Sequence, residues 1–212
     1  MISKERAADI LIDNECYVNT NHTDEDPILL PDGSAMPVYL SCRRLFSRVR
    51  GRKEVETALA ETVQQKFPGT DLVIGLATAG IGWGHAVASQ LDLPFAYVRS
   101  SAKGYGMGKL VEGDPTEGSR AVIVDDVLYS GKSLFTAIDA LEDEMNIQTV
   151  GAASIITLNG GGVEEYEEKG IPATSLTDYQ HLVDSAKSRG IISGEEYNQM
   201  ANIYASSKTL ER

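Results

Sequence analysis

Cysteine is scarce in this chain of 212 residues: there are only Cys16 and Cys42, which lie far apart and in no metal-binding spacing. This excludes a small scaffold stapled by disulfides and favours reduced thiols. Long hydrophobic runs are also missing, because no stretch approaches the roughly 20 apolar residues that a membrane-spanning helix needs. The N-terminal stretch has no apolar core of the kind that targeting signals carry. We therefore expect a cytoplasmic protein built around its own hydrophobic core.

Positive charge is the next shortage, since 19 Lys and Arg stand against 31 Asp and Glu and the formal net charge is −12. Nonspecific nucleic-acid binding depends on basic patches, so we expect no nucleic-acid partner and no membrane partner. A site for a small anion is not excluded, because backbone N–H groups and one or two cations suffice to build it.

Apolar stretches are present and alternate between strand and helix patterns. We expect strands at 71–77, 95–99, 121–126 and 149–158, and helices at 52–67, 82–91 and 133–145. Near-continuous apolar strands separated by helices indicate an α/β fold, with a central, mostly parallel sheet flanked by helices. Ligands bind to such sheets at the carboxyl ends of the strands. The residues that carry function should therefore follow the strands, at 78–84, 99–113, 125–133 and 159–162.

The stretch AVIVDDVLYSGKS, residues 121–133, combines an apolar strand, two acids and the start of a helix. It is not a P-loop, because Asp126 stands where the first glycine should be and two carboxylates would repel a triphosphate. Carboxylates instead accept hydrogen bonds from sugar hydroxyls. The free N–H groups at the helix start suit a phosphate, and Ser130 and Ser133 add hydroxyl donors. Together these features describe a site for ribose 5-phosphate.

The same stretch resembles the phosphoribosyl-diphosphate (PRPP) motif of type I phosphoribosyltransferases, apart from Tyr129, where a small residue or threonine is usual. Three further segments resemble orotate phosphoribosyltransferases in the same order along the chain: MPVYLSCRRL at 36–45, residues 75–106, and GIPATSLTDYQHLV at 170–183. The likeness covers most of residues 28–185.

The resemblance implies the type I phosphoribosyltransferase fold with a small N-terminal hood-like segment. It divides the chain into an N-terminal helix and hood segment at 1–50, a phosphoribosyltransferase core at 51–185 and a C-terminal helical tail at 186–212. It implies transfer of 5-phosphoribose from PRPP to a nucleobase, most simply orotate, with Mg²⁺ as cofactor and release of diphosphate. A homodimer that shares its catalytic loop between subunits is also implied.

Site residues follow from the matched motifs. The resemblance assigns catalytic roles to Lys103, Asp125 and Asp126, and leaves Mg²⁺ held mainly by PRPP without a firm protein ligand. The residues matched to PRPP and phosphate binding are Thr78, Ala79, Gly80, Arg99, Tyr105, Tyr129, Ser130, Gly131, Lys132 and Ser133. No residue is assigned to the base.

Departures from the family pattern keep alternatives open. Basic residues are usual where this chain has Ser100, Tyr105 and Gly160, so a base other than orotate, or a PRPP-binding regulator without turnover, stays possible. A dinucleotide-binding oxidoreductase is disfavoured, because the third glycine of its fingerprint is out of place and the next strand ends in Arg99.

Overall fold

A computed structural model describes residues 1–24, 28–29, 35–101, 109–129, 131–158, 166 and 170–210. The helices are α1 (Lys4–Asp13), α2 (Val49–Lys66), α3 (Ala79–Leu91), α4 (Lys132–Met145), α6 (Tyr179–Ser188) and α7 (Gly194–Leu210), with the 3₁₀ helices η1 (Thr20–His22) and η2 (Cys42–Ser47). The strands are β1 (Tyr17–Asn19), β2 (Ile28–Leu29), β3 (Ala35–Met36), β4 (Val38–Leu40), β5 (Leu72–Leu76), β6 (Phe95–Val98), β7 (Val111–Glu112), β8 (Arg120–Leu128), β9 (Gln148–Thr157) and β10 (Ala173–Asp178).

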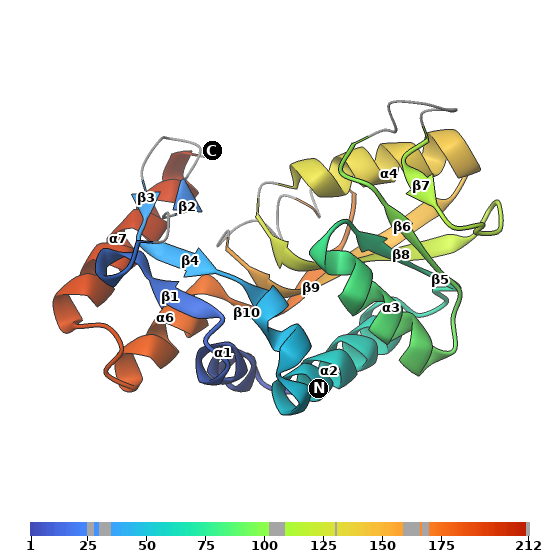
Figure 1. Cartoon of the computed structure of the whole chain (residues 1–212). Coiled ribbons are helices and arrows are strands. Elements are labelled where there is room, and N and C mark those ends of the chain that lie inside the picture. The colour runs from blue at the N-terminus through green and yellow to red at the C-terminus, as the bar shows by residue number, and fades with distance from the viewer. Residues whose placement is uncertain are drawn as a thin grey trace.

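The main sheet has six strands in the order β10-β9-β8-β5-β6-β7 (Figure 1). All neighbouring pairs are parallel except β6 and β7, so β7 is an antiparallel edge. The predicted α/β fold with a mostly parallel sheet is confirmed. The sheet brings the carboxyl ends of β5, β6 and β8 to one edge, which is where ligands bind in this architecture.

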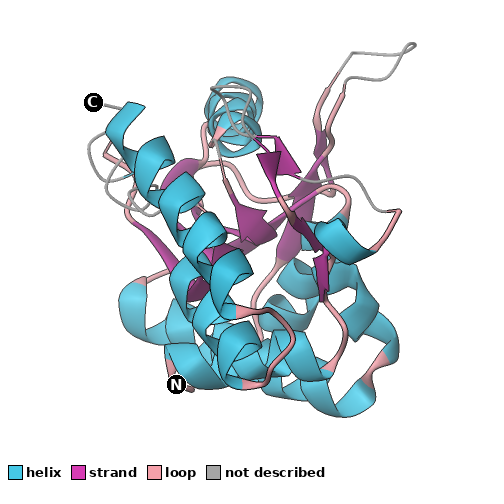
Figure 2. Ribbon diagram, turned by 90° about the vertical axis from the view of Figure 1, so that its left-hand side faces the viewer, coloured by secondary structure: helices cyan, strands magenta, loops and turns pink. Residues whose placement is uncertain are grey.

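Helices cover both faces of the sheet, with α4 on one side and α2 and α3 on the other (Figures 1 and 2). The strands alternate accordingly, because successive side chains point to opposite faces. Val73 and Val122 belong to the apolar cluster on the α2 and α3 side, whereas Ile74 and Ile123 pack with α4. Burial on both faces explains why these strands are continuously apolar in sequence.

Two element boundaries differ from the prediction. The helix expected from residue 82 begins at Ala79, because the small residues Ala79 and Gly80 form its first turn against β8 and carry no apolar signal of their own. The strand expected to end at Asp126 continues to Leu128. Its pairing with β9 runs on past the acids, from Asp125 opposite Ser154 to Leu128 opposite Thr157. The two acids therefore lie within β8 and not after it.

Most of the remaining elements lie toward the left of Figure 1, and η2 links β4 to α2; we call α1, β1 to β4, η2, α6 and α7 together the flank. Its strands form two small pairs, β1 with β4 and β2 with β3. Helix α7 starts at a capping box, in which the Glu196 N–H donates to Ser193 Oγ (3.1 Å) and the Ser193 N–H donates to Glu196 Oε2 (2.8 Å). The division of the chain near residues 50 and 185 stays a prediction.

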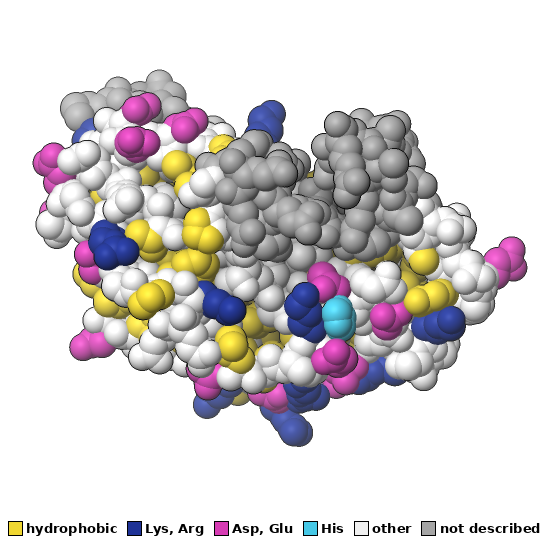
Figure 3. Space-filling model, turned by 180° about the vertical axis from the view of Figure 1, so that it is seen from behind, with side chains coloured by type: hydrophobic (Ala, Val, Ile, Leu, Met, Phe, Trp, Pro, Cys, Tyr) yellow, Lys and Arg dark blue, Asp and Glu magenta, His cyan; other side chains and the backbone are white. Residues whose placement is uncertain are grey.

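Charges of both signs are interspersed on the face seen from behind, where acidic and basic side chains lie next to one another along the lower edge (Figure 3). Within the described residues, no helix combines the length and the apolar character needed to cross a membrane.

Candidate active site

A cavity of about 440 Å³ opens where β5 and β8 end. Its described lining comprises Leu40, Arg43, Ala77, Thr78, Ala79, Asp125, Asp126, Val127, Tyr129 and Leu158. The core thus supplies most of the wall, from β8, the start of α3 and the residues that follow β5, β8 and β9, and the flank supplies Leu40 and Arg43. Of the predicted site residues, this cavity brings together Thr78, Ala79, Asp125, Asp126 and Tyr129.

Asp125 and Asp126 form the acidic part of this cavity. The Asp126 N–H donates to Asp125 Oδ1 at 2.8 Å, which fixes the first carboxyl against the backbone. Burial, together with the negative charge of Asp126, raises the pKa of Asp125 from 3.8 to about 8. Burial also raises the pKa of Asp126, although the hydrogen bond with Asp125 and the positive charge of Arg43 act in the opposite direction. Two crowded carboxyls with raised pKa values are groups that a ligand donor would stabilise in their ionised form.

Helix α3 approaches this pair closely because Gly80 has no side chain. A Cβ at Gly80 would lie 2.5 Å from the Val124 carbonyl oxygen and 3.1 Å from Asp125 Oδ1. Gly80 therefore packs against β8 and does not line the cavity, whereas its neighbours Thr78 and Ala79 do. The Ala77–Thr78 peptide bond that leads into the helix is cis.

Gly131 is the N-cap of helix α4, and its φ of +70° favours glycine. A Cβ at Gly131 would also lie 2.6 Å from the rings of Phe135 and Tyr166. The Phe135 N–H donates to the Gly131 carbonyl at 2.9 Å. The N–H groups of the first turn before Phe135 have no carbonyl within the helix, so this turn presents donors that can bind an anion.

A second cavity of about 160 Å³ adjoins the first through Ala77, which lines both. Its wall is formed by Leu76, Ala77, Val98, Arg99, Ser100, Lys132, Ser133 and Thr136. It collects the predicted residues Arg99, Lys132 and Ser133. The Arg99 guanidinium also lies 3.5 Å from Glu112 Oε1 across the β6–β7 edge. Positive charge therefore concentrates here, and the acids lie in the first cavity.

Three predicted site residues, Lys103, Tyr105 and Ser130, lie outside the described residues, as does Gly160. Sequence reasoning in turn assigned no role to Arg43, Leu40 or Leu158, which the structure places in the first cavity. The sequence does contain a signal for Arg43, because this residue stands in the segment at 36–45 that resembles orotate phosphoribosyltransferases. Leu40 and Leu158 had none, since an apolar residue at a strand end looks like core.

The described residues contain no cluster of three or more His, Cys, Asp or Glu side chains that could hold a metal ion by themselves. Asp125 and Asp126 are the acidic residues of the described lining. Two carboxylates suit an ion that takes its other ligands from a substrate phosphate and water, which is how Mg²⁺ is commonly held.

Residues 47–181 match the family model of the phosphoribosyl transferase domain. The chain belongs to the phosphoribosyltransferase family, as its sequence motifs predict. Among curated relatives, it is 34% identical to the orotate phosphoribosyltransferase of Streptococcus agalactiae serotype Ia over 173 residues, which cover 81% of this chain and 82% of the relative. It is 32% identical to that of Bacillus anthracis over 200 residues, which cover 94% and 93%.

Solved structures agree with this placement. The orotate phosphoribosyltransferase of Aeropyrum pernix is 27% identical, with a TM-score of 0.73 over 88% of this chain and 99% of that one. The UMP synthase of Leishmania donovani has a TM-score of 0.80 over 97% of this chain and 43% of that one; at 20% identity it supports the fold alone.

Proposed function

We propose that this chain is an orotate phosphoribosyltransferase, which transfers 5-phosphoribose from PRPP to orotate, yielding orotidine 5′-monophosphate and diphosphate. The observation that carries the proposal is the acidic pair Asp125 and Asp126 in the C-terminal half of β8, a few residues before Gly131 caps the start of α4. This order places acceptors for a sugar diol beside donors for a phosphate. The names of the relatives support orotate as the base.

In the proposed complex, Asp125 and Asp126 accept hydrogen bonds from the ribose 2- and 3-hydroxyls. The first turn of α4, with Ser130, Gly131, Lys132 and Ser133 and the preceding Tyr129, binds the 5-phosphate. Diphosphate lies along the turn from Thr78 to Gly80, near Arg99. These groups lie in two adjoining cavities, the first lined by Thr78, Ala79, Asp125, Asp126 and Tyr129 and the second by Arg99, Lys132 and Ser133.

The reaction is a displacement at C1 of the ribose. A ring nitrogen of the base forms the new bond to C1 as the bond from C1 to the diphosphate oxygen breaks, and the electron pair leaves with diphosphate. The carboxylates of Asp125 and Asp126 lie beside the positive charge that develops on the ribose, while backbone donors and Arg99 stabilise the leaving group. Mg²⁺, when bound, neutralises part of the diphosphate charge.

Lys103 and Tyr105 complete the proposal, as the groups that act on diphosphate as it leaves. Replacing Lys103 by Ala should lower kcat far more than PRPP affinity, because its charge acts mainly in the transition state. An equal loss in both quantities would remove that role. A homodimer that shares this loop and a cytoplasmic location remain part of the same proposal, and mass measurement in solution tests the former.

The test is a diphosphate-release assay with PRPP, Mg²⁺ and a panel of bases that includes orotate. We expect release with orotate and little with uracil, adenine or hypoxanthine. Release with a different base alone would replace the substrate and keep the reaction class. PRPP binding without release for any base would instead support a PRPP-binding regulator.

A further inference from the structure

Arg43 is the single basic residue among the described residues that line the 440 Å³ cavity. Its neighbours in sequence are all engaged: Arg44 with the Glu15 carbonyl, Arg48 with Glu15 Oε2, Arg50 with Glu54 and Arg52 with Glu56. The Arg43 guanidinium, in contrast, makes no hydrogen bond or ion pair with any part of the chain that the structure describes. It is therefore available to a ligand in the cavity.

The backbone at Arg43 is firmly placed although its side chain is exposed. Its neighbour Cys42 and, three residues on, Leu45 are fully buried in the core cluster. The Ser41 N–H donates to the Cys16 carbonyl at 2.8 Å, which ties the start of η2 to the strand pair beside it. These anchors place Arg43 in the lining of the cavity without using its guanidinium.

The position of Arg43 relative to the acids limits what it can bind. Arg43 and Asp126 line the same cavity, and they form no ion pair within 4.0 Å. The positive charge of Arg43 also counters the rise in the pKa of Asp126. The guanidinium thus lies beside the place where the ribose diol would bind, and its planar donors match a carboxylate in bidentate geometry.

We propose that Arg43 binds the carboxylate of orotate and so selects this base against pyrimidines that lack it, an inference that rests on the proposed function. In orotate the carboxylate is on the ring carbon next to the nitrogen that attacks C1. A base bonded to C1 therefore holds its carboxylate close to the ribose and to Asp126. Without a cation there, this carboxylate would face two acidic groups.

The rest of the cavity suits the remainder of the base. Leu40 from the flank and Leu158 after β9 are apolar lining residues that can contact the faces of a flat ring. Apolar contacts of this kind do not distinguish orotate from uracil, because the two rings differ only in the carboxylate. The preference for orotate over uracil then depends on Arg43.

The experiment measures equilibrium binding by calorimetry of orotidine 5′-monophosphate and uridine 5′-monophosphate, which differ only in that carboxylate. We compare the unmodified protein with Arg43→Gln and Arg43→Lys. Arg44→Gln is the matched control, since its guanidinium donates to the Glu15 carbonyl and does not line the cavity. Ribose 5-phosphate binding checks that each variant keeps its phosphate site.

We expect the unmodified protein to prefer the orotidine nucleotide, and Arg43→Gln to weaken that nucleotide alone by roughly 10- to 100-fold. Arg43→Lys should recover part of the preference, and Arg44→Gln should leave it within about twofold. Equal weakening of both nucleotides by Arg43→Gln, or no preference in the unmodified protein, would overturn the inference. Because binding is measured without turnover, a failed diphosphate-release assay would count against the proposed function and not against this assignment.

Discussion

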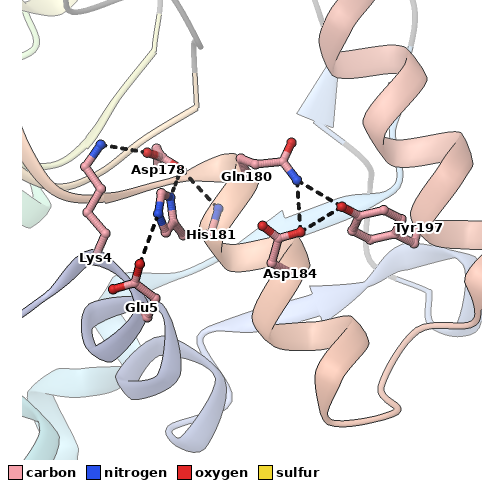
Figure 4. Close-up of polar contacts among 7 residues, drawn as sticks. All are labelled: Lys4, Glu5, Asp178, Gln180, His181, Asp184 and Tyr197. Atoms are coloured by element: carbon pink, nitrogen blue, oxygen red, sulfur yellow. Dashed lines mark hydrogen bonds and ion pairs between the residues drawn. The ribbon is translucent and has the colours of Figure 1, made fainter.

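Asp125 in the C-terminal half of β8 and Asp178 at the end of β10 belong to the same sheet, with only β9 between their strands, yet their surroundings are opposite. Asp178 accepts hydrogen bonds from Lys4 Nζ (2.9 Å) and the His181 N–H (3.0 Å), and lies 2.6 Å from His181 Nδ1 (Figure 4). Within the part of the chain that the structure describes, Asp125 accepts one hydrogen bond, from the Asp126 N–H. The protein supplies partners from α1 and α6 for Asp178, at the border with the flank, and leaves Asp125 short of them.

The pKa values of Asp178 and Asp125 differ in the direction that their hydrogen-bond partners predict. Burial alone would raise the pKa of Asp178, but the hydrogen bonds from His181 and Lys4 outweigh burial and hold it below 3.8. Burial and Asp126 raise the pKa of Asp125 to about 8. An acid that costs stability when it ionises is expected at a site that awaits a ligand, whereas a satisfied acid serves the fold.

The two regions are also held in different ways. Close backbone packing fixes the core acids, as the contact of Gly80 with Val124 illustrates. Polar contacts among side chains join α1, α6 and α7 in the flank: Figure 4 shows Lys4 and Glu5 facing Asp178 and His181, and Tyr197 facing Gln180 and Asp184. The core site should therefore tolerate less change than the flank.

Gly80→Ala should have the largest effect. Its Cβ would lie 2.5 Å from the Val124 carbonyl oxygen, so α3 must shift away from β8. We expect the free energy of unfolding to fall by about 2–3 kcal/mol, and PRPP affinity to fall with it, since overpacking against backbone is hard to relieve. Urea denaturation and calorimetry measure both. Gly194→Ala is the control, because no atom apart from its chain neighbours and the adjacent backbone of its own helix lies within 4 Å of its Cβ. An equally mild result for Gly80→Ala would contradict rigid packing of the core.

Asp125→Asn should weaken PRPP binding about tenfold or more, because the diol loses a charged acceptor. The same change should stabilise the free protein at high pH. The pKa of Asp125 lies near 8 in the folded state and near 3.8 when unfolded, so folding is favoured by this group below pH 3.8 and loses that stability as the pH rises toward 8.

Thermal unfolding between pH 5 and pH 8 tests the stability half of this prediction. The unmodified protein should lose stability across that window, and Asp125→Asn should lose less. Parallel pH profiles for the two proteins would mean that the acid is not strained by burial, and the contrast with Asp178 would disappear.

Asp178→Ala should lower the free energy of unfolding by about 1 kcal/mol. The variant loses both the cap of α6, which Asp178 forms with the His181 N–H, and the contact with Lys4. Asp178→Asn keeps a capping oxygen and should cost less. PRPP affinity should stay within about twofold in both variants. Denaturation with and without PRPP separates the two readouts; a tenfold loss of PRPP binding in either variant would place Asp178 in the site.

The core could largely be predicted from sequence. Its strands are apolar on both faces, so the periodicity that marks them is strong, and Val55, Leu59 and Val63 of α2 are buried as their spacing predicts. The acidic pair and Gly131 stand in a motif whose residue types follow from sugar and phosphate chemistry. The division of these residues between two adjoining cavities did not follow, because it depends on how the turns after β5, β6 and β8 are placed in space.

The flank could be predicted far less well. Its strands have two or three residues each, too short for any period to show. Arg43 reaches the cavity only because η2 is packed on Cys42 and Leu45, and nothing local in the sequence distinguishes it from Arg44. A role that depends on which of two adjacent arginines faces inward is a tertiary property.

Arg48→Gln should have the smallest effect on stability. It tests whether an exposed ion pair in the flank contributes less to stability than packing does in the core. Arg48 Nη2 lies 2.9 Å from Glu15 Oε2, but both side chains are more than half exposed. Solvent and salt screen such a pair, so we expect the free energy of unfolding to change by less than about 0.5 kcal/mol, and the small change to vanish at high ionic strength. Denaturation in 0.05 M and 1 M salt measures both. A loss of unfolding free energy above about 1 kcal/mol that persists in 1 M salt would contradict this expectation. Single exposed ion pairs would then hold the flank as firmly as packing holds the core. The flank would in that case position Arg43 as rigidly as β8 positions Asp125.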